Sequence, residues 1–159
     1  MEALSRDGGV RPAAGARRFD PWLAVRALGA FAVLAVGAIH LHEHSKLYSA
    51  IPTIGTLFVL NFAGATAIGL GLLAPVERLL GGRLGAVALG GLAVGGIGLA
   101  ATAFAFLAIS EHTPLFGFME PGYDPAAILA ARVAETAAIL LLGGYLIARF
   151  AGKWSTGRW

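Results

Sequence analysis

Residues 84–109 read LGAVALGGLAVGGIGLAATAFAFLAI, a stretch without one charged side chain. A helix needs about 20 mostly apolar residues to cross a bilayer, and this stretch is longer than that. Three further apolar segments of sufficient length lie at about residues 22–42, 53–74 and 126–150. Because backbone groups inside lipid must be paired within the chain, such segments are expected to be helical. The sequence therefore predicts an all-α protein, a four-helix transmembrane bundle.

The composition agrees with a membrane protein. The 159 residues are 57% hydrophobic and 13% charged, and this charged fraction is about half that of ordinary soluble domains. A chain of this length forms one domain. It contains no cysteine, which excludes disulfides, thiolate metal sites and iron–sulfur clusters. The net charge of +3 is explained by arginines at the ends of the spans, so no nucleic-acid partner is expected.

The basic residues predict the orientation of the bundle. Positive residues concentrate on the cytoplasmic side of membrane spans, and four spans place all but Lys46 and Arg132 of the twelve lysines and arginines on one side. That side holds Arg6, Arg11, Arg17, Arg18, Arg26, Arg78, Arg83, Arg149, Lys153 and Arg158. The prediction is a multi-pass protein with both termini cytoplasmic (N-in/C-in). Residues 1–21 are expected to form a disordered cytoplasmic tail, 22–150 the membrane domain and 151–159 a second cytoplasmic tail.

Small residues along three of the spans predict close helix packing, and the second span contributes Gly64, Gly69 and Gly71. Gly91 and Gly95 form a GxxxG pair. The fourth span carries alanines at every fourth position, namely Ala126, Ala130, Ala134 and Ala138. Helices in lipid associate through such surfaces because apolar side chains gain little by leaving lipid. Two interpretations stay open: packing within one bundle, or a docking face for another membrane subunit or for a second copy in a homo-oligomer.

All four histidines lie beside the same predicted face of the membrane. Three of them fall in the run IHLHEH, residues 39–44, at the end of the first span. If the helix continues through this run, His40 and His44 share a face; if the chain is extended there, all three histidines lie on one side. With nearby acids they form a candidate metal site for zinc, copper(II) or iron. Its candidate ligands are His40, His42, Glu43, His44, Glu111, His112 and Glu120.

A polar cap at the membrane surface is the other interpretation of this cluster, since its spacing matches no established metal signature. Asp124 precedes Pro125 and is interpreted as the N-cap of the fourth helix rather than as a ligand. Tyrosine and tryptophan favour the boundary between lipid and water. Four such residues are therefore expected to be interfacial anchors, namely Trp22, Tyr48, Tyr123 and Trp154.

Three polar residues are predicted to form a layer inside the bundle: Asn61, Arg132 and Glu135. A charge deep in the bilayer is costly, so Arg132 and Glu135, three residues apart in the fourth span, are expected to face the bundle and form an ion pair. This layer either fixes the helix register or extends the outer site inward. In the second case Glu135 accepts a proton and Arg132 holds an anionic head group or a quinone.

Part of the chain is similar to small membrane proteins that are common in high-GC Gram-positive bacteria. The similarity lies in GAIHLH at residues 37–42, in Tyr48 and in IPTIGTLFVLN at residues 51–61. The four-span layout also resembles the DoxX-like group, some of whose members are linked to quinone chemistry. The resemblance implies a four-helix architecture in a bacterial inner (plasma) membrane. It covers the first two spans and implies no catalytic residue.

The sequence is compatible with three functions. It favours a non-catalytic membrane subunit or small binding protein whose outer mouth holds the histidines and acids. A DoxX-like, quinone-linked oxidoreductase component would use the layer around Arg132 and Glu135 instead. A metal or proton transporter is disfavoured because the spans lack a continuous file of polar residues. No motif identifies a catalytic residue, and the candidate cofactors are zinc, copper(II), iron or a quinone.

Overall fold

The computed structural model describes residues 20–154, and within that range the chain is helical without a β-strand. The elements are α1 (Pro21–Lys46), the short 3-10 helix η1 (Tyr48–Ala50), α2 (Pro52–Leu73), α3 (Val76–Leu80), α4 (Gly82–Ser110) and α5 (Pro125–Trp154). The helices α1, α2, α4 and α5 are long and apolar enough to cross a membrane. The predicted all-α class with four spanning helices is confirmed. Most of the two predicted tails, at residues 1–19 and 155–159, lies outside the described residues.

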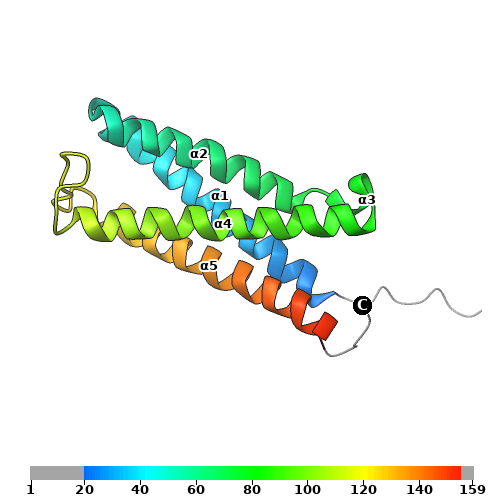
Figure 1. Ribbon diagram of the computed structural model, residues 1–159. Coiled ribbons are helices and arrows are strands. Elements are labelled where there is room, and N and C mark those ends of the chain that lie inside the picture. The colour runs from blue at the N-terminus through cyan, green and yellow to red at the C-terminus, as the bar shows by residue number, and fades with distance from the viewer. Residues whose placement is uncertain (1–19, 155–159) are drawn as a thin grey trace, which may run out of the picture.

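The four long helices run alongside one another and are connected at two ends (Figure 1). At one end, α3 joins α2 to α4, close to where α1 begins and α5 ends; we call this the α3 end. The other end carries η1 and the segment 111–124, and we call it the loop end. Helix α1 packs along α2 and α5, and α4 packs against α5 and α2, whereas α1 and α4 hardly touch. Helices α1 and α4 are therefore diagonal neighbours in the bundle.

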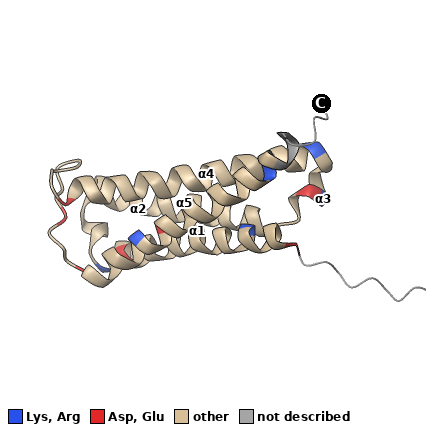
Figure 2. Ribbon diagram, turned by 90° about the horizontal axis from the view of Figure 1, so that it is seen from below, with Lys and Arg blue, Asp and Glu red and all other residues tan. Residues whose placement is uncertain are grey.

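The surface of the bundle suits lipid. Charged residues gather mainly toward the two ends and leave long apolar stretches between them (Figure 2). Large apolar side chains point outward along these stretches, and the following are each more than half exposed: Leu28, Phe31, Leu60, Leu129 and Leu140. An apolar surface of this kind is unfavourable in water and favourable among acyl chains. The fold is that of a small integral membrane protein.

An aspartate caps the first turn of both α1 and α5. The Asp20 carboxylate accepts the Trp22 N–H at 3.0 Å, and the Asp124 carboxylate accepts the Ala127 N–H at 3.0 Å. In each helix a proline follows the aspartate, where its missing N–H would have no partner within the helix. The N-cap interpretation of Asp124 is confirmed.

Glycines on several helices allow close contacts within the bundle, and two of them lie on α1. A methyl group added to Gly37 would lie 2.8 Å from the Ala65 Cβ in α2, and one added to Gly29 would lie 2.6 Å from Leu142 Cδ2 in α5. By contrast, a methyl group added to Gly91 would meet no neighbouring atom of the described chain within 4 Å. A methyl group on Gly95 would be in ordinary contact with Ile68 at 3.5 Å, whereas one on Gly96 would lie 2.8 Å from Leu142 Cδ1. The closest approach of α4 to its neighbours in the bundle core is therefore at Gly96 rather than at the predicted GxxxG pair.

Candidate functional site

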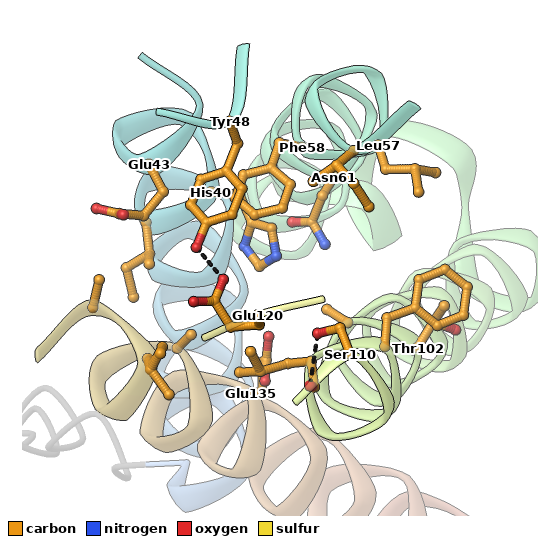
Figure 3. Close-up of a pocket in the computed structure, with 18 of the residues that line it drawn as sticks. His40, Glu43, Tyr48, Leu57, Phe58, Asn61, Thr102, Ser110, Glu120 and Glu135 are labelled. Carbon is orange, nitrogen blue, oxygen red and sulfur yellow. Dashed lines mark hydrogen bonds between the residues drawn. The ribbon is translucent and has the colours of Figure 1, made fainter. Parts of the chain in front are cut away.

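A cavity of about 410 Å³ opens at the loop end (Figure 3). All four long helices line it, together with η1 and the segment 111–124. Its volume is typical of small-molecule sites. Most of the wall is apolar and includes Ile54, Leu57, Leu99, Phe106, Leu107 and Ile128. The polar side chains of the wall are His40, Glu43, Tyr48, Asn61, Thr102, Ser110, Glu120, Asp124 and Glu135.

Small residues on α4 and α5 explain why the space is open. Gly98 and Ala103 line the cavity from α4, and Ala127 and Ala131 line it from α5. These side chains are too short to fill the gap between the helices. Farther toward the α3 end, larger side chains such as Leu142 close the core, as expected for a protein interior packed at native density.

Glu135 is the most deeply buried polar side chain of the cavity. It is 1% exposed, and its Oε2 has no hydrogen-bond partner among the described residues. At 1.5 Å per residue it lies about 15 Å from the start of α5. Burying a polar group without a partner costs free energy, and an ionisable residue inside a membrane span commonly marks a functional site. Glu135 is therefore the strongest candidate for a ligand-binding group.

Arg132 does not pair with Glu135. Its Nη2 instead forms an ion pair with Glu111 in the segment 111–124, so the ion pair expected within α5 is not formed. The Arg132 side chain is 40% exposed, because a long arginine stem can bring its charge toward the interface. The predicted polar layer is thus divided: Asn61 and Glu135 line the cavity, and Arg132 does not.

Two further polar side chains face the same space as Glu135 (Figure 3). Asn61 on α2 has a buried Oδ1 without a hydrogen-bond partner in the described part of the chain. His40 on α1 places its Nδ1 2.8 Å from the carbonyl oxygen of Val36. Because that oxygen can only accept, Nδ1 carries the proton of the neutral ring, and Nε2 is the acceptor that a ligand can use. The His40 ring also lies 4.9 Å from the Phe58 ring, which helps to fix its orientation.

Tyr48 closes the cavity at the loop end. It is 5% exposed, and its hydroxyl donates to Glu120 Oε2. Its ring stacks on Phe58 at 4.6 Å and meets Phe118 edge-on at 5.7 Å. Burial raises the pKa of the Tyr48 hydroxyl above its usual range, and the hydrogen bond to Glu120 raises it further. The prediction that Tyr48 is an interfacial anchor is wrong, because its ring lies inside the bundle.

Glu120 orders the segment 111–124. Its Oε1 accepts the N–H groups of Gly122 at 2.9 Å and Tyr123 at 3.0 Å. Its own backbone N–H donates to the Ser110 carbonyl at 2.8 Å, and its second carboxylate oxygen accepts from Tyr48. Both oxygens are therefore engaged in holding the loop, which makes Glu120 a structural residue.

The predicted metal ligands are not assembled into a site. Between residues 20 and 154, no group of three or more histidines and acids could hold a metal ion. Helix α1 runs on past the predicted end at His42 to Lys46, so the histidine run is helical. His40 and His44 consequently share a face, while the His42 side chain is 62% exposed.

Of the remaining predicted ligands, Glu43 and Glu120 line the same cavity as His40 without forming a metal-binding group among the described residues, and the others lie outside the cavity wall. His112 is exposed, Glu111 is paired with Arg132, and Glu120 holds the loop. Glu43 lies 3.6 Å from the ammonium group of Lys46. The structure therefore gives no support to zinc, copper(II) or iron as a cofactor.

Three residues of the cavity wall are not assigned to it by the sequence. Thr102 is the single residue with a hydroxyl group within residues 84–109. A lone polar residue in an apolar span is a signal from which its place in the cavity wall could have been predicted. Ser110 ends the same helix, and nothing in the sequence indicates that it lines the cavity. Tyr48 is predicted to lie at the membrane interface, because tyrosine between two spans is typical of that position.

Comparison with known proteins found no matching family model, curated protein or solved structure. The DoxX-like resemblance therefore stays a prediction. What the chain does has to be inferred from the cavity itself.

Proposed function

We propose that this chain is a membrane-embedded binding protein whose cavity at the loop end holds a small lipophilic molecule with a polar head. Glu135 carries the proposal, because it is almost fully buried and its Oε2 is unpaired among the described residues. An apolar side chain at this position would avoid the cost of burying a polar group. A ligand that hydrogen-bonds to Glu135 would offset that cost.

The groups on the wall indicate the class of ligand. The Asn61 amide can donate to a carbonyl oxygen, and His40 Nε2 can accept from a hydroxyl. Glu135 offers a third polar contact, and apolar side chains form the remaining wall. A quinone combines carbonyl oxygens with an apolar ring and tail, and its quinol form carries hydroxyls in the same places. A quinone or quinol therefore fits these groups.

The ligand enters from the lipid in this proposal. Leu60 on α2 is 60% exposed and lines the cavity. Gly98 and Thr102 on α4 are also exposed and also line it. The cavity thus borders the outer surface of α2 and α4, where an apolar tail can extend among acyl chains.

The proposed location is a bacterial inner membrane, with the α3 end and both termini in the cytoplasm. The α3 end carries Arg26, Arg78, Arg83 and Arg149, whereas the loop end carries Lys46 and Arg132, of which Arg132 is paired with Glu111. This asymmetry follows the positive-inside rule. The cavity then lies in the outer half of the membrane. Its proposed role is binding, either alone or as a non-catalytic subunit of a larger assembly.

The test compares leucine substitutions at two neighbouring residues of α5. Ala131 is 7% exposed and lines the cavity, whereas Ala130 is exposed and does not line it. The probe is a short-chain naphthoquinone, and its binding to the purified protein is measured by fluorescence quenching. We expect Ala131→Leu to weaken binding about tenfold or more, since leucine occupies the space of the ligand.

Ala130→Leu is the matched control and should bind the naphthoquinone like the wild-type protein. Thermal unfolding of both variants in the same detergent shows whether each is folded. Equal affinity of the two folded variants, or no binding to the wild-type protein, would overturn the proposal.

A further inference from the structure

A second cavity, also of about 410 Å³, lies at the α3 end of the bundle. The start of α1, the helix α3 and the last turns of α5 form its wall. Three arginines line it: Arg26 from α1, Arg78 from α3 and Arg149 from α5. Leu23 and Leu73 add an apolar side. The cavity is thus basic and lies at the opposite end of the bundle from the proposed quinone site.

The two carboxylates in this wall already have partners. Glu77 Oε1 lies 2.7 Å from Arg149 Nη2. Arg149 Nη1 also donates to the Tyr145 hydroxyl at 2.8 Å, so this arginine is held in place from two sides. Asp20 caps α1 by accepting the Trp22 N–H. The two acids offset part of the positive charge of the wall, but neither carboxylate forms an ion pair with Arg26 or Arg78.

Arg26 and Arg78 form no ion pair within residues 20–154. The Nε of Arg26 is moreover buried without a hydrogen-bond acceptor there. A guanidinium group stays charged at every physiological pH, and a buried donor without an acceptor is costly. The wall therefore carries a net positive charge, from three arginines and two acids, together with a buried Arg26 donor that has no acceptor among the described residues. An anion with oxygen acceptors would satisfy both.

We propose that this cavity binds the phosphate group of an anionic phospholipid. Guanidinium groups match phosphate oxygens with parallel hydrogen bonds, and basic pockets between membrane helices near the cytoplasmic surface suit anionic head groups. Leu23, Leu73 and the half-exposed Trp22 provide apolar contacts for the glycerol and the first carbons of the acyl chains. Inorganic phosphate has the same oxygens but has no apolar part that could contact Leu23 and Leu73. We therefore assign the phosphate group to a lipid.

The test titrates the full chain in detergent micelles with phosphatidylglycerol, phosphatidylcholine and inorganic phosphate, each separately. Native mass spectrometry counts the bound molecules. The wild-type protein is expected to prefer phosphatidylglycerol to phosphatidylcholine. Arg26→Gln and Arg78→Gln are each expected to weaken phosphatidylglycerol binding about fivefold, the effect of one basic residue near an anionic lipid.

Arg83→Gln is the matched control. Arg83 is exposed at the same end of the bundle and does not line the cavity, so its loss removes the same charge and should leave lipid affinity unchanged. Arg78 is exposed as well, so Arg78→Gln should fold. If circular dichroism shows that Arg26→Gln is unfolded, Arg78→Gln alone tests the site. Equal weakening by Arg83→Gln, or no weakening by the cavity variants, would overturn the site. Binding of inorganic phosphate with the same dependence on Arg78, and no preference for the lipid, would overturn the lipid assignment.

Discussion

Arg132 and Glu135 lie three residues apart on α5, yet Arg132 forms its ion pair with Glu111 outside that helix. A partly exposed charge pair at the loop end is thereby separated from a carboxyl group buried in the bundle. Arg132 fastens the segment 111–124 to α5, whereas Glu135 lines the cavity. Substituting the two residues should therefore have different consequences.

Glu135→Gln should weaken naphthoquinone binding about threefold to tenfold, the usual range for one hydrogen bond of about 0.5–1.5 kcal/mol. The amide keeps the shape of the side chain, so the thermal unfolding midpoint should change little. Thr136→Val is a suitable control, because Thr136 is the exposed neighbour and does not line the cavity. Unchanged affinity in Glu135→Gln would remove Glu135 from the site.

Arg132→Gln should affect stability rather than binding. The ion pair with Glu111 is partly exposed, with side-chain exposures of 40% and 23%, so its contribution to the free energy of unfolding should be about 1 kcal/mol or less. A double-mutant cycle with Glu111→Gln measures the coupling by thermal unfolding. A loss of naphthoquinone affinity as large as that of Glu135→Gln would show that Arg132 belongs to the site after all.

Gly37→Ala should destabilise the bundle by about 1–3 kcal/mol, since an added methyl group lies 2.8 Å from the Ala65 Cβ and the helices must move apart. Gly91→Ala is the matched control, because open space surrounds that position within the described chain and alanine favours helix. Thermal unfolding should rank Gly91→Ala at or above the wild-type protein. The reverse order of the two variants would contradict the packing of α1 on α2.

The charge of Asp124 should make stability depend on pH in the acid range. The hydrogen bond from the Ala127 N–H lowers the pKa of Asp124 below its usual range, and Lys46 at 3.3 Å lowers it further. A carboxyl group with a lowered pKa stabilises the folded state above the unfolded pKa of about 3.9, and this contribution is lost as pH falls through the folded value.

Asp124→Asn isolates this effect, because asparagine also caps helices well but carries no charge. The unfolding midpoint of the variant should lie below that of the wild-type protein near neutral pH, and the two should converge below about pH 4. Parallel curves through the acid range would show that the carboxylate charge makes no contribution.

The sequence predicted the spans because the required length of apolar residues is a direct physical demand of the bilayer. It did not predict that α1 continues to Lys46, because a helix can extend beyond the apolar stretch when no proline intervenes before Pro52. The alanine series illustrates a second limit. Ala134 and Ala138 are buried but Ala126 and Ala130 are exposed, since a spacing of four drifts about 40° per step around a helix of 3.6 residues per turn.

The candidate site was predictable only in part. Asn61 and Glu135 were found because polar residues stand out within apolar spans. The partner of Arg132 and the burial of Tyr48 were not, because both depend on the path of the segment 111–124, which has no helical or strand periodicity to reveal it. The polar and charged residues of the sequence indicated the end of the bundle at which the site lies, and the fold determines which of their side chains meet.

Photoaffinity labelling in lipid tests the central claim most directly. A photoreactive naphthoquinone is cross-linked to the protein in lipid nanodiscs, and the labelled residues are mapped by mass spectrometry. We predict labels within residues 98–107 and 127–135, where α4 and α5 line the cavity. Excess unreactive naphthoquinone and Ala131→Leu should each suppress these labels, and Ala130→Leu should not. Labels spread over the outward faces of the helices, or cavity labels that persist in Ala131→Leu, would contradict the account.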